Sequence, residues 1–237
     1  MDTAPRTLAV LRFRVIAAPT ADSWLASDVL PVDRLDGILG WLHQRRWPVL
    51  TAAELAAGLE DPAALPERAA LITFDGASRT VLDTALGVLR RYRFPAMAFV
   101  PTGFVGEQVT LDGLDDPMTV CTWEELRQLE RHDISVQSMG VGRRRLSRLD
   151  PVHQEREAAD SRDAIRAHVG RPADFFAYPH GDLGRDPEVT MKVVRLSGYR
   201  AAFALAGGVN ELPGADPFHL ARIRVAADTD LSKELGE

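Results

Sequence analysis

The stretch Ala69-Ala-Leu-Ile-Thr-Phe-Asp-Gly76 decides the fold class of this 237-residue chain. Residues 69–74 form a run without charged side chains, which is typical of a strand buried on both faces of a parallel sheet. Asp75 and Gly76 follow directly. Because chemistry in parallel α/β folds sits in the loops at the carboxyl ends of strands, this stretch predicts a buried strand that delivers a carboxylate to the functional end.

Outward from this strand, short apolar runs alternate with amphipathic helical patterns. The apolar runs predict further strands at 96–100, 134–138, 175–178, 200–205 and 220–225. Helices between them carry start signals: capping boxes at Thr51 with Glu54 and at Thr122 with Glu125, and Asp150-Pro151 before a charged helix that extends to Val169. This alternation predicts one α/β domain over residues 1–237 with a parallel sheet, open or closed into a barrel.

The N-terminal segment predicts a strand and no export signal. Leu11, Phe13 and Val15 alternate with Arg12 and Arg14, which is the pattern of a half-buried strand. The two arginines also interrupt the apolar run that a signal peptide requires. No apolar stretch approaches the roughly 20 residues of a membrane helix. We therefore expect a cytoplasmic protein without a membrane span.

Composition excludes several classes of function. The net charge of −6 gives no electrostatic basis for nucleic-acid binding. One cysteine, Cys121, cannot form an internal disulfide and fits no cysteine-based zinc spacing. The six histidines are widely spaced, so no local two-histidine metal motif can be written.

Several segments, taken in order, resemble the polysaccharide deacetylases, the NodB-homology group of carbohydrate esterase family four. The resemblance rests on residues 71–76, 85–96, 99–106, 123–129, 170–182, 198–203 and 216–223. It implies a distorted (β/α) barrel of about seven parallel strands. It also implies a divalent metal, usually zinc, held by one Asp and two His beside a catalytic Asp, and the removal of acetyl groups from sugars.

The chain departs from this family at the metal. Asp75 falls on the position of the catalytic base, but Gly76 stands where the family has its metal-binding Asp. Met139 and Arg143 stand at the two histidine positions. A thioether is a poor zinc ligand and a guanidinium has no free lone pair, so we expect no metal and no other cofactor.

Asp75 and His180 each allow a functional and a purely structural interpretation. Asp75 either keeps a catalytic or ligand-binding role or is a strand-end carboxylate paired with an arginine such as Arg143. His180 either assists Asp75 or is a plain turn residue. At the mouth of the barrel we expect a pocket lined by Gly76, Met139, Arg143, Tyr178 and Pro179.

These interpretations lead to three hypotheses for the role of the protein. The first is a degenerate family member that has lost zinc hydrolysis and acts as a binding or scaffolding protein, whose partner is an acetylated or acidic oligosaccharide or a protein of a polysaccharide pathway. The second is a hydrolase of carbon–nitrogen non-peptide bonds, either a sugar N-deacetylase or a metal-free amide hydrolase, that uses Asp75 and His180 with Arg143 as oxyanion donor. The third is a purely structural or oligomerising domain.

Overall fold

The computed structural model describes residues 5–17, 29–110 and 117–236. An eight-stranded sheet forms its centre, in the order β10–β9–β8–β5–β4–β1–β11, with β12 paired to β1. All neighbours are parallel except β1 and β11. The strands are β1 (Arg6–Phe13), β4 (Arg68–Asp75), β5 (Ala96–Val100), β8 (Ile134–Ser138), β9 (Phe175–Ala177), β10 (Ala201–Phe203), β11 (Asn210–Leu212) and β12 (Ile223–Arg224).

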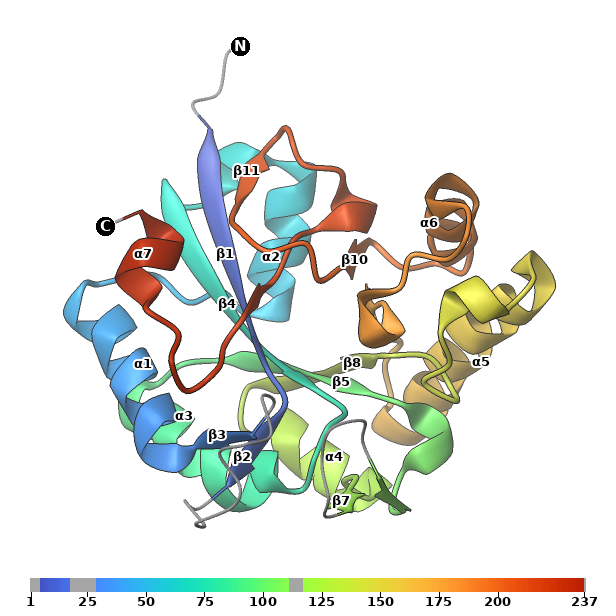
Figure 1. Ribbon diagram of the computed structural model, residues 1–237, viewed down its shortest axis with the longest axis horizontal. Coiled ribbons are helices and arrows are strands. Elements are labelled where there is room, and N and C mark those ends of the chain that lie inside the picture. Colours follow the sequence, from blue (N-terminus) through green and yellow to red (C-terminus); the bar gives the residue numbers. More distant parts are fainter. Residues whose placement is uncertain (1–4, 18–28, 111–116, 237) are drawn as a thin grey trace.

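The segment from Leu220 to Arg224 brings the two sides of the sheet together. Leu220 exchanges backbone hydrogen bonds with Ala202 and Ala204 beside β10, and Ile223 and Arg224 then pair with β1. This connection curls the sheet into a distorted barrel (Figure 1). The predicted parallel barrel of about seven strands is therefore confirmed, with β11 as an antiparallel addition that the sequence analysis missed.

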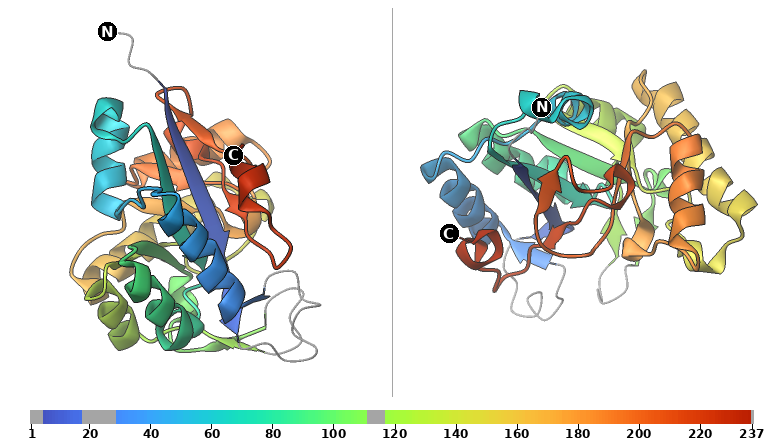
Figure 2. Two further views of the ribbon diagram at one scale, coloured as in Figure 1. Left: turned by 90° about the vertical axis from the view of Figure 1, so that its left-hand side faces the viewer. Right: turned by 90° about the horizontal axis from the view of Figure 1, so that it is seen from above.

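Helices surround the curled sheet, as the views in Figures 1 and 2 show. Their bounds are α1 (Val32–Gln44), α2 (Ala52–Glu60), α3 (Leu86–Tyr92, preceded by a π-helical turn at Val81–Ala85), α4 (Trp123–Glu130), α5 (Pro151–Val169), α6 (Pro187–Leu196) and α7 (Leu231–Leu235). Two small sheets, β2 (Val15–Ala17) with β3 (Val29–Pro31) and β6 (Gln108–Val109) with β7 (Met118–Thr119), complete the elements. Within the described parts of the chain, no helix combines the length and apolar character that crossing a bilayer requires.

The helix start signals behave as predicted. Thr51 and Thr122 each form a full capping box with the glutamate three residues later. Asp150 accepts a hydrogen bond from the backbone N–H of His153, and Pro151 occupies the first turn of α5. These local signals fix where α2, α4 and α5 begin, and so where the loops before them end.

The core divides into an inner and an outer part because side chains alternate along each strand. We call the inner part, inside the barrel, the inner cluster. It includes Leu8, Val10, Leu71, Met97, Phe99, Met139, Phe175, Phe203 and Leu220. Residues of α2 such as Leu55 and Ala56 belong to the same cluster, so α2 covers the amino-terminal end of the barrel. A larger outer cluster lies between the sheet and the surrounding helices.

The prediction of a half-buried strand at Arg12 and Arg14 was wrong. Both arginines are buried, with exposed fractions of 7% and 6%. Arg12 is on the same face of β1 as the inner-cluster residues Leu8 and Val10, and it continues that face toward the carboxyl end of the barrel. An alternation of apolar and charged residues signals a solvent-exposed face only when no buried counter-charge is present, and here Asp75 supplies one.

Candidate functional site

Asp75 lies at the carboxyl end of β4 and is held by two arginines from distant parts of the chain. Arg12 Nε donates to Oδ2 at 2.9 Å. Arg222 donates from one guanidinium nitrogen to Oδ1 at 2.6 Å and from another to Oδ2 at 3.2 Å. We call Arg12, Asp75 and Arg222 the Asp75 cluster. All three residues are buried, and the Arg222 guanidinium also lies 5.6 Å from the centre of the Phe99 ring.

This arrangement keeps the carboxylate ionised. Burial alone would raise the pKa of Asp75, but the charges of Arg222 and Arg12 and their hydrogen bonds outweigh it and hold that pKa below its usual value. Burial lowers the pKa of Arg222, and the carboxylate of Asp75 opposes that shift. The structural interpretation of Asp75 as a strand-end carboxylate paired with an arginine agrees with the structure, but its ion pairs are with Arg12 and Arg222 and not with the suggested Arg143.

Gly76 forms a tight turn directly after Asp75. Its φ is +87°, a conformation that side-chain-bearing residues rarely adopt, and its N–H donates to the carbonyl of Phe99 at 2.9 Å. A Cβ at this position would lie 3.0 Å from Cε of Met118. Gly76 is thus adapted to a turn, and an aspartate placed here would meet both backbone strain and this methionine.

Met139, which follows β8, belongs to the hydrophobic interior. Its side chain is part of the inner cluster and only 2% of its surface is exposed. Its N–H donates to the carbonyl of Val100, which extends the pairing of β5 and β8 by one residue. Met139 therefore packs into the barrel core below the carboxyl end.

The loop after Met139 is fixed by a buried glutamate. One oxygen of Glu157, on α5, accepts hydrogen bonds from the N–H groups of both Val141 and Gly142 at 2.8 Å. Cβ atoms at Gly140 and Gly142 would approach the Glu157 carboxylate to 2.9 and 3.2 Å, so this close packing requires glycine. The carbonyls of Gly140 and Val141 accept from Thr102 and Gly103 on the opposite side. The loop is consequently held in one conformation.

His180 faces this loop from the turn after β9. Its Nε2 lies 3.1 Å from the carbonyl oxygen of Arg143, so Nε2 carries the proton and donates. His180 and Arg143 have positive φ values of 59° and 51°, an uncommon conformation for residues other than glycine. The bonds of Asp75 go to Arg12 and Arg222, so the structure does not pair the two residues expected to share a catalytic role.

Tyr178 and Pro179 are buried beside this turn. Tyr178 is fully buried in the outer cluster and its hydroxyl donates to the carbonyl of Phe218 at 2.9 Å. Burial raises the pKa of this hydroxyl well above its usual value. The structure therefore places Tyr178 in the packing behind the site, where it supports the turn instead of facing a ligand.

A pocket of about 590 Å³ opens between the two loops. We call it the basic pocket; its lining residues are Gly142, Arg143, Arg144, Arg145, Arg148 and His180. It brings together the expected site residues Arg143 and His180. Since the loop and the turn follow parallel strands β8 and β9, this pocket opens at the same end of the barrel as Asp75.

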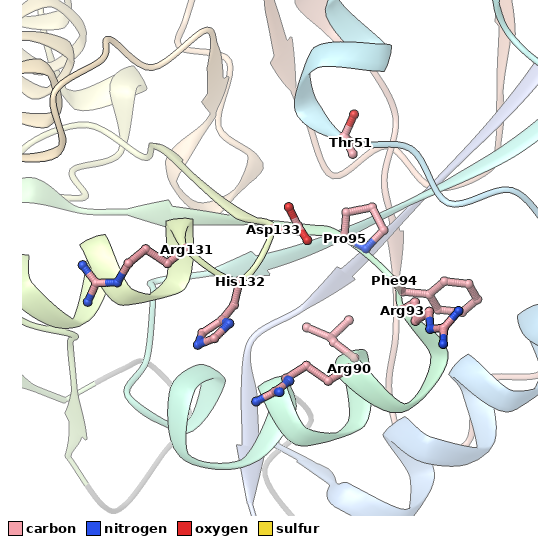
Figure 3. Close-up of a pocket in the computed structure, with 9 residues that line it drawn as sticks. Thr51, Arg90, Arg93, Phe94, Pro95, Arg131, His132 and Asp133 are labelled. Carbon is pink, nitrogen blue, oxygen red and sulfur yellow. The ribbon is translucent and has the colours of Figure 1, made fainter.

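A second pocket, of about 440 Å³, lies at the other end of the barrel. We call it the amino-end pocket. It is lined by residues that precede β5 and β8, among them Arg93, Pro95, Arg131 and Asp133. Figure 3 shows that the Arg93 and Arg131 side chains extend to opposite sides of it. Basic residues here also follow the carboxyl ends of α3 and α4, where they complement the helix dipoles.

The family model for polysaccharide deacetylases matches residues 63–202, which is more than half of the chain. The chain belongs to the polysaccharide deacetylase family. Its matched region runs from β4, with Asp75, through β9 and His180 to β10. The resemblance recognised in the sequence motifs is thereby confirmed.

Individual family members are distant. The Bacillus subtilis protein YxkH, provisionally named a polysaccharide deacetylase, is 27% identical over 202 residues, covering 83% of this chain and 66% of that protein. Poly-beta-1,6-N-acetyl-D-glucosamine N-deacetylase of Staphylococcus aureus (strain MRSA252) is 22% identical, covering 69% of this chain and 56% of the relative. This chain therefore spans less than two thirds of the length of either relative.

Solved structures share the fold. The Streptococcus pyogenes deacetylase PplD, in complex with acetate, superposes with a TM-score of 0.83 at 18% identity and covers 97% of this chain and 98% of its own. IcaB from Ammonifex degensii superposes with a TM-score of 0.78 at 23% identity, covering 96% and 94%. At these identities the likeness establishes the barrel architecture.

The residues at the expected metal positions do not fit a divalent cation. Gly76 has no side chain, Met139 is sealed in the inner cluster, and Arg143 carries a positive charge. Both oxygens of Asp75 are hydrogen-bonded to guanidinium groups. Among the residues that the structure describes, no three His, Cys, Asp or Glu side chains gather as a metal site requires.

Three residues of the site were not identified from the sequence: Arg12, Arg222 and Glu157. A signal for Arg222 was present, because it stands between apolar residues of a predicted strand, and a buried arginine needs an acidic partner. Glu157 gave no such signal, since it lies among many charged residues of α5. Its function depends on the loop packed against it, which only the folded chain reveals.

Proposed function

We propose that this chain is a non-catalytic member of the polysaccharide deacetylase family that binds a glycan at the carboxyl end of its barrel. The observation that carries the proposal is the Asp75 cluster. The carboxylate at the position of the family's catalytic base has both oxygens engaged by Arg12 and Arg222, inside the protein.

A carboxylate in this state is a poor general base. A general base works best when its pKa lies near the operating pH, and the two arginines move the pKa of Asp75 in the opposite direction. It would also have to break charge-assisted hydrogen bonds to accept a proton. These considerations weigh against the hydrolase alternative as well, because that mechanism also relies on Asp75.

Metal-dependent hydrolysis of an acetyl group would need three protein ligands and an open position on the cation. Substitution of the three expected ligands by Gly76, Met139 and Arg143 supports the loss of this chemistry. The backbone and packing have adapted to these residues: Gly76 has a left-handed turn, and Met139 fills the barrel core. The pocket beside them remains open and polar, which supports a retained binding role.

The test combines metal analysis, an acetyl-release assay and glycan binding on the same purified protein. Zinc is added, and acetyl release from N-acetylated glucosamine oligomers is measured with and without a chelator. We expect that the protein binds no stoichiometric zinc and releases no acetyl groups. We also expect calorimetry to detect glycan binding. Chelator-sensitive acetyl release by the wild-type chain would overturn the proposal, and a failure to bind any glycan would favour a structural domain.

The triple variant Gly76→Asp, Met139→His, Arg143→His provides the matched comparison. We expect zinc uptake by this variant and none by the wild type. Because an aspartate is strained at position 76 and a histidine is costly in the barrel core, its folding is checked first by thermal unfolding. Zinc uptake by both proteins through the same site would contradict the proposed loss.

A further inference from the structure

We propose that the basic pocket binds an oxyanion carried by a sugar residue, such as the carboxylate of a uronic acid or a sulfate ester, so that the glycan bound by this chain is an acidic one. This inference rests on the proposed binding function and specifies its ligand. The charge, the rigidity and the size of the pocket support it.

The charge of the pocket is opposite to that of the whole chain. Four of its six lining residues are arginines and none of the six is acidic, whereas the chain carries a net charge of −6. Four guanidinium groups around one pocket create a positive local potential that favours an anion. Arginine is also the side chain best suited to carboxylates and sulfates, which its planar fork binds with two hydrogen bonds.

Two acidic residues near the loop hold its backbone, and one of them, Asp182, also lies close enough to Arg145 for the two charges to interact. Glu157 accepts from the backbone N–H groups of Val141 and Gly142, as described above. Asp182 accepts from the hydroxyl of Ser147 at 2.6 Å and from the N–H of Gly184 at 2.9 Å. Their hydrogen bonds hold the loops in place, and neither residue lines the pocket.

The pocket is built on a fixed backbone. Glu157 fixes the loop from α5, and His180 fixes it through the carbonyl of Arg143. The left-handed backbone at both Arg143 and His180 is a departure from relaxed geometry of the kind that collects at binding sites. A fixed loop presents its arginines with little ordering cost on binding.

The size of the pocket favours a sugar-borne anion over a free one. A volume of about 590 Å³ is in the range of small-molecule sites and is much larger than a phosphate or sulfate ion needs. The pocket also opens at the barrel end where the glycan is proposed to bind. The amino-end pocket lies at the opposite end of the barrel, away from the proposed glycan site.

The test is calorimetric titration of the full chain with four probes: trigalacturonic acid, a sulfated disaccharide, the neutral N-acetylated glucosamine trimer and inorganic phosphate. The variant is the pair Arg145→Gln and Arg148→Gln, in an exposed loop. The control pair is Arg90→Gln and Arg93→Gln, which removes the same charge from the amino-end pocket. We expect an acidic sugar to bind the wild type, more weakly as salt is raised. The variant Arg145→Gln, Arg148→Gln (the pocket pair) should bind the acidic sugar about tenfold more weakly or worse, and the control pair should bind it as the wild type does.

Each alternative outcome of the titration would overturn one claim. Equal binding of the acidic sugars by the wild type and the pocket pair, or no binding of either, would refute the inference. Tighter binding of the neutral trimer would refute it while leaving the proposed glycan-binding function intact. Phosphate binding as tight as that of the acidic sugars would refute the sugar requirement. Conversely, pocket-dependent binding by a chain that releases acetyl groups would refute only the non-catalytic function.

Discussion

Arg222 donates hydrogen bonds to both oxygens of Asp75 across 147 positions of sequence. Arg222 belongs to the segment that joins the two sides of the sheet, and Asp75 is the last residue of β4. With Arg12 of β1 on the other side, this ion cluster stabilises the closure of the barrel. The carboxylate that was expected to act in catalysis is thereby held within a structural contact.

Removing the charge of Asp75 should destabilise the fold. Asp75→Asn leaves the buried Arg12 and Arg222 uncompensated, and we expect a loss of about 3–5 kcal/mol in the free energy of unfolding, measured by urea denaturation. Asp83→Asn is the control, because its ion pair with Arg79 is exposed and should cost less than about 1 kcal/mol. Equal losses in the two variants would show that the Asp75 cluster contributes no special stability.

The stabilisation by Asp75 should depend on pH in the acid range. Because its folded pKa lies below the unfolded value of about 3.9, the contribution is complete above that value and is lost as the pH falls through the folded pKa. The stability difference between wild type and Asp75→Asn should therefore be largest near neutrality and shrink in acid. Urea titrations over a series of pH values measure it, and a difference that grows toward acid would contradict the assignment.

Met139 should behave as a core residue. Met139→Ala removes buried volume from the inner cluster, and we expect it to cost about 2–5 kcal/mol. Met139→Leu keeps the volume and should cost less than about 1.5 kcal/mol. Met191→Ala, at a half-buried position on α6, provides the comparison in the same denaturation experiment. A mild effect of Met139→Ala would mean that this side chain is not packed in the barrel interior.

Glu157 should control the rigidity of the basic pocket. In Glu157→Ala the N–H groups of Val141 and Gly142 lose their acceptor, at a cost of about 1–3 kcal/mol for each group left buried. Hydrogen exchange should accelerate at these two amides. Glu155→Ala, an exposed change on the same helix, should leave them unchanged. Slow exchange in both variants would show that the loop is held by other contacts.

Cys121 should be unreactive in the native protein. Burial, with the charges of Glu125 and Asp83, raises the pKa of its thiol to about 12, and the thiolate is the reactive form. A disulfide reagent at mildly alkaline pH should label it only after denaturation. Labelling of the native chain at the rate of an exposed thiol would show that this part of the outer cluster opens readily.

Much of the architecture could be predicted from the sequence because it depends on patterns among residues that are close together in the chain. The unbroken apolar run before Asp75 specified a buried parallel strand, and the capping boxes at Thr51 and Thr122 specified where two helices begin. The strands at 96–100 and 134–138 agree with the structure residue for residue. Strand β12 lies within the predicted strand at 220–225 but spans two residues of it, and the antiparallel β11 was missed because three residues are too few to show a pattern.

By itself the sequence determined a barrel of the polysaccharide deacetylase type and the identity of the residues at its expected metal positions. Only the tertiary structure decided what those residues do, because ion pairs such as Arg12 and Arg222 with Asp75 join segments far apart in the chain. Alternation along β1 could not reveal that Arg12 is buried, since its burial depends on a counter-charge supplied by another strand. In the same way, the arginines after Met139 became a pocket only once Glu157 and His180 fixed the loop that carries them.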